Sequence, residues 1–512
     1  MTRLTDIPDL DLPDLDLPTP YAPEERPRDA GRRAFLRSAA IALGTGAALS
    51  LAPFRGLRAA PIERLPFAAG FGPLAPTADL FTGQPLLRLP EGFAYRSFGW
   101  VGDRMSDGFL TPPGHDGMGS FQSATGRTFL VRNHELLGPV GVAQVEGITY
   151  DPTQAGGTTT LEIDPRTGRV LSSFVSLSGT VRNCAGGKTP WGSWLSCEET
   201  TDGPDTLPGL VQEKHGYIFE VPVLTRATAQ PLRAMGRFRH EAVAIDPETG
   251  IAYETEDEGS AGFYRFVPRT YGRLADGGSL EMLAVAGEPG ADLRTGQEVG
   301  AIVPVTWVPV PDPDPVDAPD RGVFRQGQSR GGATFSRLEG VFAGDGRIFF
   351  VSTDGGVARA GQVWVFDPRR QELCLLFESA GAAELENPDN IALSPRGGLI
   401  LCEDASAPTN LQGLTQDGQI FPFAENNLEL SGLATGLLAQ IIRAEFGIEL
   451  PPFVNRAVIE LVLDLLGNPE LSFRGAEFAG ATFSPDGRLL FCNIQVPGVS
   501  FVIAGPFGAG GL

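Results

Sequence analysis

The stretch "AIDPETGIAYETEDEG", Ala244–Gly259, contains the pattern on which the fold prediction depends. Two short apolar segments flank a D-P-x-T-G turn, and the second segment ends in a run of carboxylates. The same order of segments recurs with an S-P-x-G turn in "NIALSPRGGLILCEDA", Asn390–Ala405, which also ends in carboxylates, and in "ATFSPDGRLLFCNIQ", Ala481–Gln495. Asp-Gly and Gly-Gly turns between alternating apolar residues are typical of β-hairpins. Because these hairpins recur, the sequence predicts an all-β fold built from repeated strand pairs.

The repeated strand pairs favour a β-propeller. Looser copies of the pattern are "LEIDPRTGRVLSSF" and "VFAGDGRIFFVSTDGG", and "GQVWVFDP" and "GYIFEVP" supply further strands. One such unit cannot bury both of its faces, so several units must stack around a centre. We expect about six blades. A β-sandwich and two tandem domains are the alternatives that the pattern leaves open.

Two segments interrupt the repeats. The segment "PVTWVPVPDPDPVDAPD", Pro304–Asp320, is rich in proline and predicts a surface loop rather than a central strand. Residues 430–467 contain apolar residues at helical spacing, as in "GLLAQIIRAEFGI" and "NRAVIELVLDLLG". The sequence therefore predicts a small helical insertion that packs on the propeller, with partner binding as an alternative role.

The N-terminal region is predicted to be an export signal rather than part of the fold. Arg32 and Arg33 directly precede a weakly apolar stretch from about Ala39 to Pro53, which is too short for a stable membrane span. Twin arginines in this context indicate recognition by the Tat export machinery. We therefore expect residues 1–60 to be an acidic leader and signal peptide, and residues 61–512 to form one domain in the periplasm or outside the cell. A plain membrane anchor is the alternative.

The charge of the chain limits its partners. The formal net charge is −22, and lysine occurs at Lys188 and Lys214, so arginine supplies nearly all the cations. An acidic surface repels nucleic-acid backbones and anionic lipid, and we expect it to bind neither. If the substrate is itself an anion, cations must lie between it and the carboxylates.

Carboxylates follow several of the predicted strands. They occur in Cys197-Glu198-Glu199, in Glu254–Glu258, in Cys402-Glu403-Asp404 and, with a histidine, in Asn133-His134-Glu135. In a propeller, equivalent strand ends converge on the central opening, where clustered carboxylates repel one another unless cations compensate. Oxygen donors in this number suit calcium or magnesium. A set of solvated strand ends is the alternative interpretation.

Cys184 lies in "RNCAGGKTPWGSWLSCEE", beside the carboxylates. A thiolate among oxygen ligands would indicate a softer or redox-active metal such as iron, while a small buried cysteine is the alternative. Neither His134 nor His240 makes a zinc-binding spacing with another histidine or cysteine. With five cysteines in the chain, at least one stays unpaired or bound.

Five ordered motifs resemble the PhoX-type alkaline phosphatases. They are "NCAGGKTPWGSWLSCEE", "RHEAVAIDPETGIAYETED", "SRLEGVF", "ENPDNIALSPRGGLILCED" and "AEFAGATFSPDGRLLFCNIQ". The resemblance covers roughly residues 85–505. It implies a propeller around a cluster of ferric iron and calcium ions bridged by an oxo group, and hydrolysis of phosphate monoesters in an exported enzyme. The chain is shorter than better-known members, and its helical insertion departs from the family pattern.

The resemblance also implies roles for individual residues. Cys184 would be the iron ligand, Glu256, Glu339 and Asp389 would be further metal ligands, and Arg337 would contact the substrate phosphate. Less specific ligand candidates are Glu135, Asn183, Glu198, Glu199, Glu403, Asp404 and Glu477. Two other functions remain open at this point: a calcium-dependent lactonase or phosphotriesterase, and a binding propeller in which calcium is structural.

Overall fold

The computed structural model of the chain describes residues 70–512, apart from 124, 407, 416, 431–432, 434, 447–458 and 460–471. The predicted leader with Arg32 and Arg33 therefore lies outside the described residues, as does most of the second half of the predicted helical insertion. The described part belongs to one compact unit, Ala68–Leu512.

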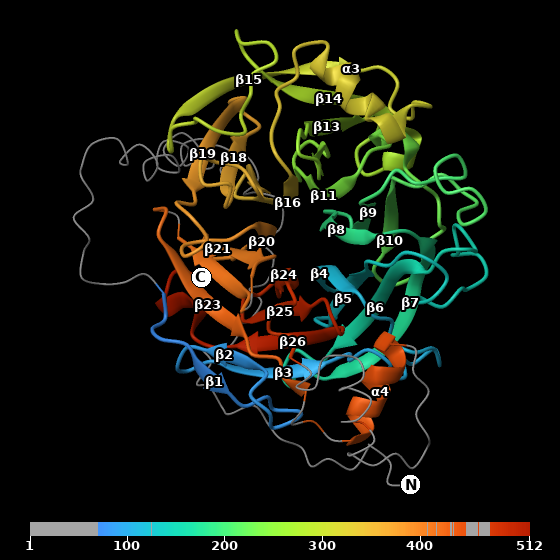
Figure 1. Cartoon of the computed structure of the whole chain (residues 1–512), viewed down its shortest axis with the longest axis vertical. Coiled ribbons are helices and arrows are strands. Elements are labelled where there is room, and N and C mark those ends of the chain that lie inside the picture. The colour runs from blue at the N-terminus through green and yellow to red at the C-terminus, as the bar shows by residue number, and fades with distance from the viewer. Residues whose placement is uncertain are drawn as a thin grey trace, which may run out of the picture. The chain divides into compact units, whose positions relative to one another are not determined.

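Six antiparallel meanders follow one another in the described part of the chain (Figure 1). The first contains β4 (His115–Gln122), β5 (Thr128–His134), β6 (Gly156–Ile163) and β7 (Val170–Thr180), and the second contains β8 (Asn183–Lys188), β9 (Ser193–Glu198) and β10 (Ile218–Pro222). The third contains β11 (His240–Ile245), β12 (Ala252–Glu256), β13 (Phe263–Pro268) and β14 (Gly278–Val285), and the fourth contains β16 (Leu338–Gly344), β17 (Arg347–Ser352), β18 (Gln362–Asp367) and β19 (Glu372–Glu378). The fifth contains β20 (Pro388–Leu393), β21 (Leu399–Glu403), β22 (Asn410–Leu414) and β23 (Ile420–Asn426), and the sixth contains β24 (Phe478–Phe483), β25 (Leu489–Ile494), β26 (Val499–Ala504) and β3 (Ala94–Phe98).

The first strands of the meanders form a closed ring. The strand β4 contacts β8, β8 contacts β11, β11 contacts β16, β16 contacts β20, β20 contacts β24, and β24 contacts β4 again. These strands lie around the middle of Figure 1, while the later strands of each meander lie farther out. The N-terminal strand β3 pairs antiparallel with β26, so the last meander is completed by the start of the fold. This arrangement is a β-propeller, as the sequence predicts, rather than a sandwich or two tandem domains.

Apolar side chains fill the space between neighbouring meanders. Between the third and the fourth, the rings of Phe263 and Phe350 stack with their centroids 4.3 Å apart, and Trp364 stacks beyond Phe350. All three side chains are buried. Packing of this kind gives each meander the second apolar partner that it cannot provide alone.

Every inner strand carries the same irregularity near its start. The inner strand is the first strand of each meander, and its pairing with the second strand shifts register close to its start. The shift falls between His115 and Met118, between Asn183 and Gly186, and between His240 and Val243 in the first three meanders. The other three meanders shift at Leu338/Val341, Pro388/Ile391 and Ala479/Thr482. In each case three residue steps on the inner strand oppose two on its partner, which defines a β-bulge. The bulges therefore repeat around the ring.

The proline-rich segment differs in part from its prediction as a loop. Residues Ile302–Val310 form strand β15, which pairs with β14 on one side and with β19 on the other. This strand lies at the outer side of two meanders, where proline is tolerated because few ladder hydrogen bonds are lost. The remainder of the segment, with helix α3 (Gly322–Gln328) after it, is not part of the sheets.

The remaining elements lie outside the six meanders. The short strands β1 (Ala75–Thr77) and β2 (Leu87–Leu89) extend the fifth sheet beyond β23. Helix α4 (Thr435–Phe446) lies within the predicted insertion, and the described side chains Leu438, Ile441 and Ile442 are buried. Among the helices that the structure describes, none has the length and apolar character needed to cross a membrane.

Candidate metal centre

The repeated bulge directs one side chain of each inner strand to equivalent positions around the ring. Directly after the first paired residue, five of the inner strands carry a potential metal ligand: Asp116, Cys184, Glu241, Glu339 and Asp389. The sixth inner strand has Gly480 at this place, and Glu477 lies just before that strand. Five ligand-type residues at one structural position indicate a shared site rather than separate strand ends.

A second set of ligand-type residues lies directly after the second strand of four meanders. It consists of Glu135, Glu199, Asp257 and Asp404, whose backbone N–H groups donate to the carbonyls of Gly114, Arg182, Arg239 and Asn387, respectively, at 2.9 to 3.2 Å. In the fourth meander Thr353 makes the equivalent bond to Arg337. These hydrogen bonds hold the second set of side chains beside the bulges.

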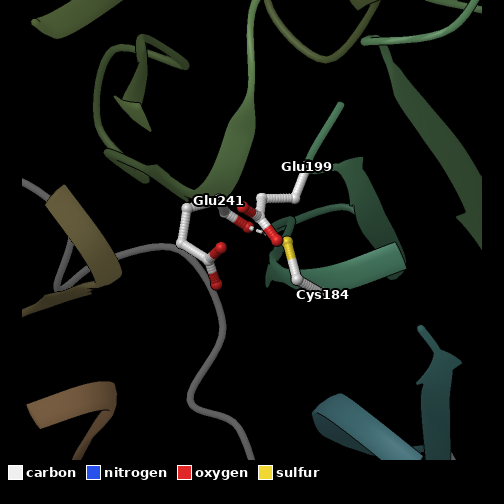
Figure 2. A group of neighbouring side chains, drawn as sticks. All are labelled: Cys184, Glu199 and Glu241. Carbon is white, nitrogen blue, oxygen red and sulfur yellow. Dashed lines mark hydrogen bonds between the residues drawn. The ribbon is translucent and has the colours of Figure 1, made fainter. Parts of the chain in front are cut away.

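In the described part of the chain, all residues of the first set, two of the second set (Glu135 and Glu199) and Glu477 fall into three groups, two of which share Glu241. Within each group the potential ligand atoms lie within 4.8 Å of one another: Cys184, Glu199 and Glu241; Asp116, Glu135 and Glu477; and Glu241, Glu339 and Asp389. Figure 2 shows the first group, in which the two carboxylates and the sulfur point toward one another. Glu241 belongs to two groups, so a carboxylate there could bridge two cations.

The electrostatic field of these groups opposes their ionisation. Burial, followed by the charges of neighbouring carboxylates, raises the pKa of Glu241, Glu339, Asp116 and Glu477 well above the ordinary range. For the same reasons the pKa of Asp389 is raised to about 7. Burial and then the charge of Glu241 also raise the pKa of the Cys184 thiol. Cations between these groups would remove the repulsion and keep the ligands ionised.

Arginines supply part of the positive charge at the site. The Arg337 guanidinium donates to both carboxylate oxygens of Asp257, at 2.8 and 3.0 Å, and to Glu339 at 2.6 Å. Its side chain retains 35% exposure, so it faces solvent beside the groups. Arg239 pairs with Glu199 at 2.5 Å. Because Nε and Nη2 of Arg337 already donate to Asp257 and Glu339, its Nη1 N–H groups are the donors that remain to bind an anion at the site.

Three other predicted ligands point away from the three groups, because each is the last residue of a second strand. Glu198 accepts hydrogen bonds from the backbone N–H groups of residues 181, 216 and 217 and from His215. Glu256 accepts from Gly262 N, Tyr264 Oη and Arg321. Glu403 accepts from backbone N–H groups and from the amides of Asn410 and Gln412. These carboxylates hold the loop that leads to the third strand of their own meander.

Two further predicted ligands also lie outside the groups. The Asn183 amide donates to Ser196 Oγ of its own meander at 2.8 Å, and its oxygen accepts from Thr180 Oγ1 at the end of β7 in the preceding meander. Asp404 is exposed, but its charge contributes to the raised pKa of Asp389 and Glu477. Asp404 therefore lies at the edge of the cluster.

Comparison with known proteins identifies the family of the chain. The sequence matches the model of the alkaline phosphatase PhoX family over residues 69–173 and 165–450. The chain belongs to this family. The resemblance of its motifs to PhoX phosphatases is thereby confirmed, and the chain is a phosphatase rather than a lactonase or a binding propeller.

One solved structure, a PhoX phosphatase, supports the fold. PhoX from Pseudomonas fluorescens, in complex with the transition-state analogue vanadate, is 16% identical with a TM-score of 0.57, over 87% of this chain and 99% of that chain. A gluconolactonase from Xanthomonas campestris is 11% identical over 85% of this chain and 99% of its own, with a TM-score of 0.37. Virginiamycin B lyase from Staphylococcus aureus is 10% identical over 80% and 99%, with a TM-score of 0.35. Comparison with curated protein sequences found no significant match.

Three residues of the PhoX site are not among those predicted from the sequence. They are Asp116, Glu241 and Asp257. Glu241 lies within a motif of the resemblance, "RHEAVAIDPETGIAYETED", directly after a histidine, and Asp116 has the same place after His115. The signal that could have found both is an acidic residue at the start of an inner strand followed by a small residue. Asp257 directly follows Glu256, the residue that the resemblance implies as a ligand, and it contacts Arg337 instead of belonging to one of the three groups.

All five cysteines of the PhoX chain are free thiols. Cys184 Sγ lies 3.3 Å from the backbone carbonyl of His240 and 3.4 Å from that of Glu241, and it can donate to either. Cys197, Cys402 and Cys492 are buried as well, while Cys374 is partly exposed. Cys184 is the one cysteine that belongs to a ligand group in the described part of the chain.

We predict that the buried His215 stabilises the fold through its charge. His215 Nδ1 donates to Glu198 at 2.6 Å, and Nε2 lies 3.4 Å from Asp151. Although burial opposes the charge, these carboxylates raise the pKa of His215 from its ordinary 6.5 to about 9. The stabilisation is therefore complete below pH 6.5 and is lost as pH rises through about 9, and it corresponds to about 3 kcal/mol.

Urea unfolding of the wild type and of His215→Gln at several pH values checks this. The variant should lose about 3 kcal/mol of unfolding free energy near pH 6, and the difference should shrink above about pH 9. A difference that is independent of pH would show that packing, and not charge, accounts for the role of His215.

Proposed function

We propose that the chain is an exported, metal-dependent alkaline phosphatase that hydrolyses phosphate monoesters and uses calcium and ferric iron. The observation that carries the metal assignment is the contrast between two kinds of carboxylate. Glu198, Glu256 and Glu403 are saturated with hydrogen bonds, whereas no described residue donates a hydrogen bond to the buried carboxylate of Glu241 or to the partly buried carboxylates of Asp389 and Glu477. Buried carboxylates without donors fit cation ligands.

The donor atoms suit two kinds of cation. The groups Asp116, Glu135, Glu477 and Glu241, Glu339, Asp389 offer oxygen alone, which calcium prefers. The remaining group adds the Cys184 sulfur to the carboxylates of Glu199 and Glu241, and a thiolate beside carboxylates favours a softer ion such as iron. Arg239 lies beside this group through its ion pair with Glu199, which limits the net negative charge there.

The cations, when bound, would supply the positive charge that attracts the phosphate oxygens and stabilises the leaving alkoxide. The residues of the chain would position the substrate phosphate and orient the ligand carboxylates. Arg337 would bind phosphate oxygens through its Nη1 N–H groups, while Asp257 and Glu339 accept from Nε and Nη2 and hold the guanidinium in place. The Gln495 amide donates to Glu135 at 2.7 Å and to Asp116 at 3.2 Å, so it fixes two ligand carboxylates. Positioning of this kind lowers the barrier because the charges need no rearrangement during reaction.

The experiment that tests the function is turnover of a generic aryl phosphate by purified protein at alkaline pH, combined with elemental analysis. We expect hydrolysis, calcium and iron in the protein, and loss of turnover after calcium chelation that calcium restores. Turnover that persists with calcium confirmed absent contradicts the calcium assignment. A metal-replete protein that cleaves phosphodiesters or phosphotriesters, but no monoester, contradicts the proposed substrate class.

The choice between Glu241 and Glu256 provides a matched pair of variants. Glu241→Gln should lower kcat on the order of a thousandfold and reduce the bound metal, because it removes an ionised ligand shared by two groups. Glu256→Gln should retain metal and most activity, and should instead lower the unfolding free energy by about 1–3 kcal/mol, since it disrupts buried hydrogen bonds. Metal analysis, kinetics and thermal melting distinguish the two. Equal loss of metal in both variants would show that the assignment to Glu241 over Glu256 is wrong.

Cys184→Ser tests the iron separately from the calcium. Thiolate bound to ferric iron gives a visible charge-transfer absorption, and serine is a far poorer anionic donor of similar size. We expect the wild type to be coloured, and the variant to lose colour, iron and most activity while its melting temperature changes little. Cys402→Ser is the control for removing a buried thiol. Stoichiometric iron and normal turnover in Cys184→Ser would assign the residue to packing alone.

Export by the Tat machinery rests on Arg32 and Arg33 before the weakly apolar stretch. A carboxylate cluster that needs cations is consistent with a route that carries folded proteins, because the cations can be bound before export. Replacing both arginines by lysine should leave the full-length precursor in the cytoplasm, as seen by cell fractionation. Normal processing of that variant would argue against Tat export.

A further inference from the structure

A cavity of about 240 Å³ lies along the inner strands, beyond the bulges that carry the ligand groups. Its wall includes Met118 of β4, Val243 of β11, Phe342 of β16 and Thr482 of β24, so residues far apart in the sequence surround it. None of the residues that line it belongs to the three ligand groups. The cavity is therefore a separate feature of the propeller.

A single charged side chain lies in this wall. Lys188, at the end of β8, is the one ionisable residue that lines the cavity, and the chain has just one other lysine. Its Nζ lies 5.7 Å from the centre of the Phe342 ring. Neither a hydrogen bond nor an ion pair joins the Lys188 side chain to any other described residue, although acidic residues exceed basic ones by 22 in the chain. An ammonium group without a counter-ion is unusual in so acidic a protein.

The surroundings of Lys188 suit an apolar body better than a hydrated ion. Burial lowers the pKa of Lys188 to about 8, so it remains mostly protonated at neutral pH. Trp194, Phe342 and Val341 contribute ring and aliphatic surface to the wall. The Trp194 ring is fixed, because its Nε1 donates to Asn133 Oδ1 at 2.9 Å. A cavity with one cation, fixed aromatic surface and few polar partners favours an organic anion over inorganic phosphate, which would lose its hydration without replacement.

We propose that this cavity binds a small organic monoanion, with a flat apolar body and one carboxylate that pairs with the Lys188 ammonium. The apolar body would pack against the aromatic side chains, and the ammonium would gain the counter-ion that the protein does not supply. The volume accommodates a ligand the size of benzoate. This site does not depend on the metal centre or on the proposed function.

Calorimetric titration of benzoate into the metal-replete protein at pH 7 tests the proposal, with saturating inorganic phosphate present to occupy the phosphatase site. We expect benzoate to bind at least tenfold more tightly than benzamide, its neutral analogue, because the ion pair requires the carboxylate. Lys188→Met should abolish this preference while turnover of an aryl phosphate stays within twofold. Lys214→Met, at the other lysine, should leave benzoate binding unchanged.

Several outcomes would overturn the proposal. These are no benzoate binding, equal binding of benzamide, preference retained in Lys188→Met, or equal loss in Lys214→Met. If Lys188→Met does not fold, crystals of the wild type soaked in 4-iodobenzoate provide the second measurement. An anomalous iodine peak within the cavity beside Lys188 supports the proposal, and iodine confined to other places refutes it.

Discussion

Each inner strand contains an extra residue at the same point, and the geometry of the site depends on that bulge. In a regular strand, successive side chains point to opposite faces, so a strand lying along the axis would place alternate residues toward its neighbours. The bulge turns one residue of each strand out of this alternation. Five inner strands place Asp116, Cys184, Glu241, Glu339 and Asp389 at that residue. The closed ring of strands then brings residues more than 250 positions apart into groups less than 5 Å across.

The same geometry makes the apo site electrostatically unfavourable. Burial and mutual repulsion raise the pKa of Glu241, Glu339 and Glu477, so these carboxyl groups favour the neutral form unless cations offset the negative charge. Arg337 and Arg239 pair with Asp257, Glu339 and Glu199, but they cannot balance the rest. Bound cations would recover the free energy that the cluster costs, and their binding would thus stabilise the fold.

The sequence was sufficient to predict the propeller, because its hairpin turns are local signals. It was also sufficient to predict that strand ends converge, and Glu135 and Glu199 from that argument lie in the groups; Cys184, Glu339 and Asp389 were expected there from the resemblance to PhoX phosphatases. It could not decide between Glu256 and Asp257, because neighbouring residues of a strand differ only in the face to which they point, and the register sets that face. The strand β15 was missed because proline argues against a central strand and says little about an outer one. The number and identity of the cations depend on which carboxylates share a cation, and the order of residues in the sequence does not specify this.

The residue after each ligand explains why the bulges have a recognisable sequence. Inner strands approach one another closely at this point: a Cβ on Gly117 would lie 2.5 Å from Ala185 Cα, and one on Gly340 would lie 2.8 Å from the Asp389 carbonyl. A side chain at Gly117 or Gly340 would clash with the neighbouring strand, and glycine or alanine follows the ligand at four of the five ligand-bearing bulges (Asp-Gly, Cys-Ala, Glu-Ala and Glu-Gly), while the fifth has Asp-Asn. One residue of the bulge therefore provides the ligand, and the next residue permits close packing of the strands. The small residues also begin the wall of the Lys188 cavity, at Ala185 and Ala242. On the inner strands, the ligand residues and the first residues of the cavity wall are therefore adjacent in sequence. The carboxylates lie at one end of these strands, and the Lys188 ammonium lies farther along them, in the more apolar part.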